Sequence, residues 1–315
     1  AVWTAKSIGY AAASPRGIQT LERLHTLTAA RMPEVAKFRK QFQEQEIDVL
    51  FCSHQRPPSI IPPVLAARSL GIPTATFIFS WDNLSSKGRI AAPFDHYLLW
   101  SEHMRDEMRR FYPQVAPERL HVVGTPQFDP YADESRLWSR AEFCRRVGAD
   151  PTRPLICFSG GDVGNSIEDH LHVRALLELI RDGQIGNRPQ VILRPAPVDD
   201  GTRYSPVRRD HPELIYAQPA WISAEQGDWS AVFPLEEDVT FLANLTYHCD
   251  LNVNFASTMT LDFALRDKPV INLAFDVAST PVFGMPMWDY YQQWEHYRPV
   301  IELGAARFAR TRQEL

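Results

Sequence analysis

The sequence predicts an α/β protein that consists of two doubly wound parallel-sheet domains in tandem. Short apolar runs alternate with amphipathic helical segments along most of the chain, a pattern typical of a parallel sheet covered by helices on both faces. The length of 315 residues is ordinary for two domains. A polar, Pro-containing segment interrupts the alternation between 125 and 153. We therefore predict domains at 1–135 and 136–315.

In the first half of the chain, short runs rich in β-branched and aromatic residues predict strands. They lie at 47–53, 74–80, 96–101 and 121–124. Segments with apolar residues at helical spacing among charged ones predict helices at 19–47, 64–70 and 101–112. The first of these segments is long enough for either one helix or two.

In the second half, the same alternation of strands and helices resumes after the polar segment. Strands are predicted at 154–160, 190–195, 213–217, 251–255 and 269–275. Helices are predicted near 165–182, 235–248 and 257–266. The chain does not begin with Met and stops within a helix-like segment, so we expect it to be a piece of a longer protein.

Composition argues against several classes of function. The net charge of -5 argues against nucleic acid as the main partner, because binding to a phosphate backbone needs a basic surface. The four cysteines are far apart and show no CxxC spacing, so neither a zinc site nor a disulfide framework is expected. No run approaches the length of about 18 apolar residues that a membrane-spanning helix needs. We expect a cytoplasmic protein in a reducing compartment.

Polar loops follow several predicted strands, and in open parallel sheets ligands bind outside the carboxyl ends of the strands. The loop SGGDVGNS begins with Ser159, Gly160 and Gly161, between a strand and a helix. Glycines let backbone amides approach an anion, and the helix that follows directs its dipole toward it, so this loop is a candidate phosphate site. A tight strand-to-helix turn is the alternative, since the sequence contains neither a P-loop nor a GxGxxG motif.

The turn ASTMT, at the start of the predicted helix 257–266, is a second candidate anion site. Ser257 and Thr258 add hydroxyl donors to the free amides of a helix start, a combination suited to a diphosphate. Asp262 lies one helical turn after Thr258 and could accept hydrogen bonds from two ribose hydroxyls. Arg194 ends an apolar strand and could supply the countercharge. A helix cap, an acid stabilised by the helix dipole and a salt bridge at the sheet end are the alternatives.

The first half offers two candidates for a general base. His54 follows one predicted strand, and Asp82 lies in the loop SWDNLSSKGR after the next. Either side chain could deprotonate an acceptor hydroxyl. The alternatives are that Asp82 forms a turn and that His54 is a hydrogen-bonded bystander. No GxSxG motif occurs, so a Ser-His-Asp triad is not expected.

The segment PLEEDVTFLANLTYHCDLNVNFASTMTLDFALRDKPV (234–270) resembles the donor-nucleotide half of GT-B glycosyltransferases. Similar segments, with an acid six residues before Lys-Pro-Val or its equivalent, occur in peptidoglycan N-acetylglucosaminyltransferases and in non-hydrolysing UDP-N-acetylglucosamine 2-epimerases. Here Asp262 stands six residues before Lys268. HVVGTPQFDPY (121–131) is similar to the end of the first domain of such enzymes and of teichoic-acid glycerophosphotransferases. SWDNLSSKG and WSEHMRDEM resemble bacterial surface and capsular polysaccharide glycosyltransferases.

The resemblance implies a GT-B fold, in which two tandem Rossmann-like doubly wound parallel-sheet domains face a cleft. The domain at 1–135 would hold the acceptor, and the domain at 136–315 would hold the nucleotide sugar. GT-B enzymes begin with a Gly-rich loop after the first strand, and no such loop precedes residue 47 here. We therefore expect the first strands of the first domain to be missing from this sequence.

The resemblance also implies a role for each site residue. The backbone at Val232 and Phe233 would contact the nucleotide base, and Asp262 would hold the ribose. Asp276 would bind donor-sugar hydroxyls, with a simple turn residue as the alternative. The residues around the diphosphate would be Ser159, Gly160, Gly161, Arg194, Ser257 and Thr258.

The implied function is transfer of a sugar from a nucleotide diphosphate donor, with UDP as the expected nucleotide, to a hydroxyl of a glycan or lipid-linked glycan. Inversion is expected, without a metal or another cofactor, and with peripheral contact at the inner face of the plasma membrane. Two departures limit the alternatives. Asn254 stands eight residues before Asp262, where retaining enzymes often have Glu, and Ala196 stands in RPAP, where glycerophosphotransferases have His.

Three other functions stay open at this stage. One is an enzyme like UDP-GlcNAc 2-epimerase, which would need several carboxylates facing one sugar. The second is a polyol phosphate transferase of the CDP-glycerol type. The third is a GT-B scaffold subunit without catalytic activity.

Overall fold

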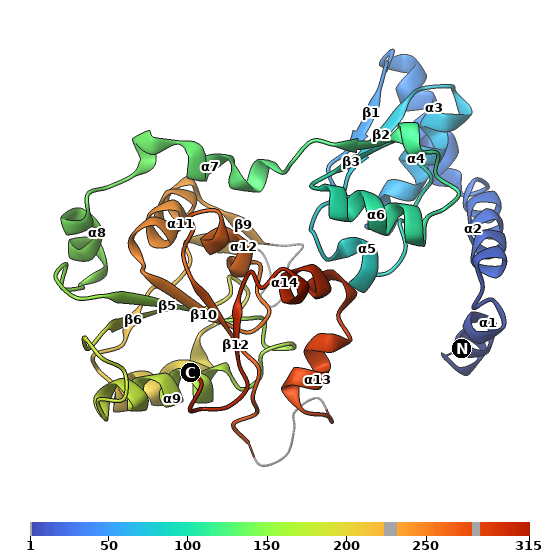
Figure 1. Ribbon diagram of the computed structural model, residues 1–315. Helices are drawn as coiled ribbons and strands as arrows, with labels where there is room; N and C mark the ends of the chain where they lie inside the picture. Colours follow the sequence, from blue (N-terminus) through green and yellow to red (C-terminus); the bar gives the residue numbers. More distant parts are fainter. Residues whose placement is uncertain (1, 224–231, 279–283) are drawn as a thin grey trace. The chain divides into compact units, whose positions relative to one another are not determined.

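The computed structural model describes residues 2–223, 232–278 and 284–315, and it divides into two compact units (Figure 1). Unit 1 comprises Ala1–Thr125, and unit 2 comprises Pro126–Leu315. Each unit has its own parallel sheet with helices, so the predicted α/β class with two parallel-sheet domains is confirmed.

Unit 1 contains a four-stranded parallel sheet in which the strands follow chain order. The strands are β1 (Leu50–Cys52), β2 (Thr74–Phe77), β3 (His96–Leu99) and β4 (Leu120–Val122). The helices are α1 (Val2–Ala11), α2 (Pro15–Ala29), α3 (Pro33–Glu44), α4 (Ile61–Ser69), α5 (Asn83–Ser86) and α6 (Glu102–Phe111). Because the strands are in chain order, every crossover steps in the same direction. Because they are parallel, the carboxyl ends of all four strands lie along one edge.

Unit 2 contains a six-stranded parallel sheet in the order β12-β11-β10-β5-β6-β7. These strands are β5 (Leu155–Ser159), β6 (Gln190–Arg194), β7 (Ile215–Tyr216), β10 (Leu251–Asn254), β11 (Val270–Leu273) and β12 (Arg307–Ala309). The chain first builds outward from β5 to β7 and then returns to build from β10 to β12 on the other side of β5. The switch between the two directions therefore lies between β5 and β10.

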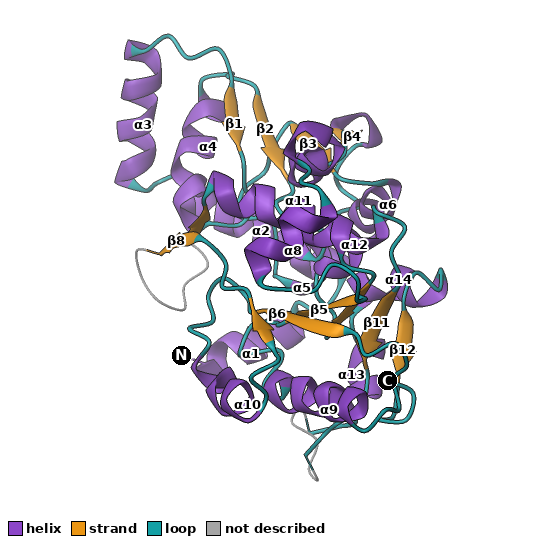
Figure 2. Ribbon diagram, turned by 90° about the vertical axis from the view of Figure 1, so that its left-hand side faces the viewer, coloured by secondary structure: helices purple, strands orange, loops and turns teal. Residues whose placement is uncertain are grey.

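The helices of unit 2 cover both faces of its sheet, and Figure 2 shows α9 (Asp169–Arg181) and α11 (Glu236–His248) on opposite sides. Its other helices are α7 (Asp129–Ala132), α8 (Arg140–Val147), α10 (Ser205–Asp210), α12 (Met259–Ala264), α13 (Met287–Gln292) and α14 (Arg298–Glu302). Strand β5 is buried along its whole length, as expected for a central strand covered on both faces. An antiparallel pair, β8 (Trp221–Ser223) and β9 (Val232–Pro234), lies outside the main sheet.

Each strand that the sequence predicts is present in the structure, and the predicted helical segment 19–47 forms two helices, α2 and α3. Strand β12 and the β8–β9 pair are additional elements that the sequence pattern did not predict. Within the described ranges, none of the helices has the length and apolarity that a bilayer-spanning segment requires.

Candidate functional site

The carboxyl ends of β5 and β10 form the centre of the candidate site in unit 2. These strands are neighbours, and Ser159 pairs with Asn254 in the last register position of both. They are also the two strands between which the sheet changes its direction of winding. A switch of this kind leaves a crevice at the carboxyl edge, because the loops after the two strands lead to opposite faces. The loops 160–168 and 255–258 are therefore placed on either side of one position.

A buried network of amide and hydroxyl groups lies beneath this position. Asn254 accepts hydrogen bonds from the Ser257 backbone N–H at 2.9 Å and from Asn272 Nδ2 at 3.2 Å, and it donates to Asn252 Oδ1 at 2.6 Å. Asn252 Nδ2 donates in turn to Ser159 Oγ at 2.7 Å. All these side chains are buried. Each of these buried groups finds a hydrogen-bond partner inside the protein, so the network holds the loops after β5 and β10 in place.

The turn between β10 and α12 is held in a strained conformation. Ala256 has φ of 45°, in the left-handed region that non-glycine residues seldom adopt. Its N–H donates to Tyr291 Oη at 2.8 Å, and the Met259 N–H donates to Ser257 Oγ at 3.3 Å. Ser257 and Thr258 are half-buried, at the start of α12 as predicted from the sequence. Strain of this kind persists only where neighbouring groups enforce it, and it is frequent at binding sites.

The glycines of the β5–α9 loop are needed for packing. A Cβ at Gly160 would overlap Tyr204 Oη, and a Cβ at Gly161 would overlap Ser166 Oγ. The Gly161 N–H donates to Asp169 Oδ2 at 2.6 Å. The Gly161 amide is one of those expected to bind an anion, and it already donates its hydrogen bond to a carboxylate of the protein.

A buried ionic cluster clamps this loop. Arg203 donates to Asp199 Oδ2 at 2.7 Å and to the Gly161 carbonyl at 2.8 Å, and its guanidinium lies 3.6 Å from Asp169 Oδ2. Asp169 is almost fully buried, and its burial raises the pKa of the carboxyl to about 7 although Arg203 opposes the shift. The cluster gives the loop a fixed shape and places a carboxyl group that titrates near neutral pH beside the candidate site.

Gly160→Ala is expected to destabilise the protein by about 1 to 3 kcal/mol, since the new Cβ forces the buried Tyr204 ring to move. Tyr204→Phe removes the overlapping oxygen, so the double variant should regain most of the loss. Urea unfolding of both variants checks this, with Gly186→Ala as the control because nothing lies within 4 Å of a Cβ at Gly186. Equal losses for Gly160→Ala and Gly186→Ala would contradict the packing role.

Arg194 is buried at the carboxyl end of β6, and its guanidinium pairs with Asp238 of α11. Nη1 lies 3.1 Å from Asp238 Oδ1, and Nη2 lies 2.7 Å from Oδ2. Asp238 also accepts hydrogen bonds from the Ala220 N–H and from Trp221 Nε1. Burial alone would raise the pKa of Asp238, but these donors, Arg194 first among them, hold it below its ordinary value. Arg194 is thus not a free countercharge, since its charge is matched within the protein.

Asp262 is buried on α12, and Tyr131 Oη donates a hydrogen bond of 2.5 Å to its Oδ1. Burial raises the pKa of Asp262 to about 6, although the hydrogen bond from Tyr131 and the charge of Arg194 oppose the shift. Such a carboxylate lacks the hydration that would stabilise its charge. It would therefore gain from accepting further hydrogen bonds from a ligand.

The remaining unit 2 residues named from the sequence lie on surrounding loops and strands. Val232 is buried and Phe233 is exposed on β9, where they pair with β8. Asp276 follows β11, and its Oδ2 accepts from the Met287 N–H at 3.0 Å, while Oδ1 is buried and has no hydrogen-bond partner among the described residues. The loop FDVAST also includes residues 279 and 280, which lie outside the described part of the chain.

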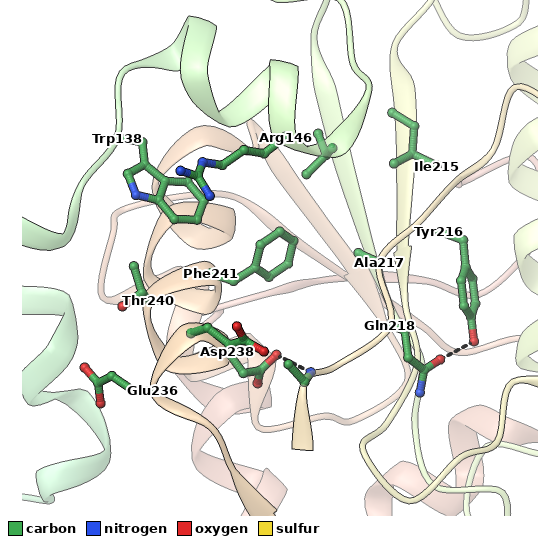
Figure 3. Close-up of a pocket in the computed structure, with 13 residues that line it drawn as sticks. Trp138, Arg146, Ile215, Tyr216, Ala217, Gln218, Glu236, Asp238, Thr240 and Phe241 are labelled. Atoms are coloured by element: carbon green, nitrogen blue, oxygen red, sulfur yellow. Dashed lines mark hydrogen bonds between the residues drawn. The ribbon is translucent and has the colours of Figure 1, made fainter. Parts of the chain in front are cut away.

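A cavity of about 620 Å³ lies beside this region, between α8, α11 and the edge strand β7 (Figure 3). Trp138, Tyr216 and Phe241 contribute aromatic rings to its lining, and the Arg146 guanidinium lies 4.2 Å from the Trp138 ring centroid. Asp238, which pairs with Arg194 at the end of β6, also lines the cavity.

His54 and Asp82, the two candidate bases, both lie beyond the carboxyl edge of the unit 1 sheet, as the sequence predicts. Nδ1 of His54 accepts a hydrogen bond of 3.2 Å from the Arg56 backbone N–H. Burial, followed by the charge of Arg56, lowers the pKa of His54. Asp82 accepts hydrogen bonds from Asn83 Nδ2 at 3.0 Å and from Ser86 Oγ at 3.1 Å.

Three solved structures illustrate the folds to which this chain is similar. The UDP-GlcNAc 2-epimerase from Methanocaldococcus jannaschii aligns with a TM-score of 0.55 at 11% identity, over 89% of this chain and 71% of that one. The epimerase from Neisseria meningitidis, bound to UDP-GlcNAc, aligns with 0.55 at 9% identity, over 89% and 69%. MnaA from S. aureus, in a structure with UDP, aligns with 0.54 at 11% identity, over 89% and 67%.

The chain has the GT-B fold. At sequence identities of 9 to 11%, the similarity to these structures is one of fold alone. No protein-family model matches the sequence, and no curated protein matches it.

Within the GT-B fold, the structure gathers most of the predicted unit 2 residues at one edge of the sheet. Ser159, Gly160, Gly161 and Arg194 follow or end β5 and β6, and Ser257, Thr258 and Asp262 follow β10. Among the described residues, no three His, Cys, Asp or Glu side chains are grouped so that they could hold a metal ion.

Sequence reasoning missed the partners of these residues. Tyr131, Asp169 and Asp238 contact Asp262, Gly161 and Arg194 respectively. Tyr131 and Asp238 do lie inside segments that resemble GT-B enzymes, HVVGTPQFDPY and PLEEDV. That position was the one signal in the sequence that could have drawn attention to them.

Proposed function

We propose that this protein is a glycosyltransferase that moves a sugar from a nucleotide diphosphate donor to a hydroxyl of a surface glycan or lipid-linked glycan. One observation carries the proposal: Asp262, the 255–258 turn and the glycine loop meet where the unit 2 sheet changes direction. Open α/β sheets bind ligands at this position. The structural neighbours from N. meningitidis and S. aureus are named with bound UDP-GlcNAc and UDP, which supports a uridine nucleotide.

In this proposal the nucleotide lies across the switch between β5 and β10. Asp262 accepts hydrogen bonds from the ribose, while Ser257, Thr258 and the backbone of the β5–α9 loop surround the diphosphate. Asp238 uses one donor from each Nη of Arg194, so further donors of the guanidinium remain for the diphosphate. Negative charge grows on the diphosphate as it leaves, so these donors would stabilise the transition state more than the ground state.

The other roles follow from the same placement. The backbone at Val232 and Phe233 would contact the base, and Asp276 would bind donor-sugar hydroxyls. We propose transfer with inversion, without a metal or another cofactor, in the cytoplasm and in peripheral contact with the inner face of the plasma membrane. The alternative, suggested by the names of the structural neighbours, is a UDP-GlcNAc 2-epimerase.

Thermal stabilisation by nucleotides tests the proposal. UDP or a UDP-sugar at 100 times its Kd is expected to add about 2.7 kcal/mol to the free energy of unfolding. A melting temperature that no nucleotide diphosphate or nucleotide sugar shifts would refute the proposal. Release of UDP that depends on an added glycan acceptor distinguishes transfer from epimerisation, because an epimerase interconverts UDP-sugars without an acceptor.

A further inference from the structure

An exposed aromatic ring lies at the carboxyl edge of the unit 1 sheet, outside the nucleotide residues discussed above. Phe79 follows β2 and is 56% exposed. One face of its ring is stacked on His54, which follows β1, with the ring centroids 4.5 Å apart and the planes 2° apart. Phe79 is more than half exposed although His54 covers one face of its ring, and from this we infer that the opposite face is open to solvent. We call Phe79 and His54 the aromatic platform.

A buried glutamine holds the aromatic platform in place. Gln55 is 1% exposed, and its Oε1 accepts a hydrogen bond of 3.1 Å from the Phe79 backbone N–H. Its Nε2 donates to Asn83 Oδ1 at 3.0 Å, and the backbone carbonyl of Gln55 accepts a hydrogen bond from the Ala91 N–H. A single side chain therefore fixes the loops after β1 and β2, so Phe79 is exposed on a rigid support and not on a loose loop.

The hydrogen bond to His54 determines which ring nitrogen carries the proton. A backbone N–H can only donate, so Nδ1, which receives the Arg56 N–H, must hold the lone pair. The lowered pKa keeps the ring neutral at pH 7, with its proton on Nε2. His54 is then a hydrogen-bond donor at Nε2, and its one lone pair is in use. This argues against His54 as the general base and leaves Asp82 as the candidate for that role.

We propose that the aromatic platform binds a pyranose ring of the acceptor glycan, an inference that rests on the proposed glycosyltransferase function. A pyranose has an apolar face of C–H groups and a rim of hydroxyls. The electron-rich face of Phe79 attracts the C–H face, and His54 Nε2–H donates to a hydroxyl on the rim. Polar groups for other hydroxyls follow in the same loop, where the Asp82 carboxylate lies 3.6 Å from Lys87 Nζ. A single ring among polar groups is too small for a stable protein interface.

Saturation-transfer NMR with the methyl β-glycosides of glucose, galactose and N-acetylglucosamine, recorded with UDP present, tests this proposal. At least one glycoside should receive saturation at its ring C–H protons, and Phe79→Ala should weaken its binding about tenfold. Phe79→Trp should retain binding because the stacking face is kept. Phe51→Ala is the matched control. Phe51 is nearly as exposed as Phe79, at 54%, but it lies within β1 and not in a loop at the carboxyl edge, so its loss should leave glycoside binding unchanged.

Two variants of His54 test whether this side chain acts as a hydrogen-bond donor to the glycoside. His54→Gln keeps an N–H donor and should bind the glycoside within about twofold of the wild type, whereas His54→Ala should bind several-fold more weakly. Loss of binding in both variants to the same extent would overturn the donor assignment.

Three results would overturn the aromatic platform as a carbohydrate site. They are the absence of saturation transfer in the wild type, equal binding by Phe79→Ala and Phe51→Ala, and loss of nucleotide stabilisation in Phe79→Ala, which would indicate a nucleobase site. The proposed function fails separately, since its failure appears as the absence of any nucleotide stabilisation in the wild-type protein.

Discussion

Asp262→Asn is expected to raise the free energy of unfolding at pH 7 and to weaken stabilisation by UDP. The pKa of Asp262 is about 6 in the folded protein against an ordinary value of 3.8 for an aspartate carboxyl, so the folded state binds this proton more tightly. The stability that this difference provides is fully present below pH 3.8 and is lost as the pH rises through 6. Above pH 6 the buried charge costs about 3 kcal/mol, a penalty that the neutral amide removes.

The weaker UDP binding follows from the same carboxylate. Asn can accept one hydrogen bond from a ribose hydroxyl but lacks the charge that strengthens it, so nucleotide affinity should fall at least tenfold. In the wild type, UDP affinity should decline below pH 6, because the protonated carboxyl is a poorer acceptor.

Thermal and urea unfolding between pH 5 and 8, with and without UDP, measure both effects. Asp267→Asn is the matched control, because Asp267 is exposed five residues further along and its left-handed backbone suits Asn. An Asp262→Asn protein that is less stable than the wild type at pH 7, or that UDP stabilises as well as before, would contradict the assignment.

Arg194→Ala is expected to destabilise the protein by about 3 to 5 kcal/mol, since it leaves the Asp238 carboxylate buried without its charged partner. The side chains of both residues are no more than 6% exposed. The Ala220 N–H and Trp221 Nε1 would still donate to Asp238, but they carry no charge. The pKa of Asp238 should rise in the variant, so the destabilisation should be smaller at acidic pH.

Urea unfolding measures the loss, and two variants control for it. Arg109→Ala breaks a pair with Asp106 that is exposed on both sides, and it should cost less than about 1 kcal/mol. The double variant Arg194→Met/Asp238→Leu removes both charges and should recover much of the stability of the wild type. If Arg194→Ala costs no more than Arg109→Ala, the buried Arg194–Asp238 pair does not contribute to stability as expected.

The strands of both sheets could be predicted from the sequence because each is a compact apolar run with helical segments on either side. The β5 sequence LICFS is apolar almost throughout, and it is buried throughout. Strand β12 could not be predicted in this way, since Arg307–Ala309 is short and includes a charged residue. The β8–β9 pair could not be predicted either, because Trp221–Ser223 and Val232–Pro234 are only three residues each and the second ends in Pro.

The location of the site could also be predicted, since residues that follow parallel strands gather at one edge. The burial and the hydrogen-bond partners of each site residue could not be predicted. Tyr131 and Asp262 are 131 positions apart, and Arg194 and Asp238 are 44 apart. No periodicity links such pairs, and only the folded chain shows that Arg194 is paired or that the Asp262 carboxyl is buried.

The switch between β5 and β10 also has a consequence for the folding of unit 2. Asn252 and Cys157, which bond across these two strands, are 95 positions apart in the chain. Neighbouring strands in unit 1 are consecutive in sequence and close much shorter loops. Closing a longer loop costs more chain entropy, and contacts between distant residues slow folding. The strands that frame the proposed nucleotide site are therefore expected to pair late, so a nascent chain would acquire its binding site only after most of unit 2 has been synthesised.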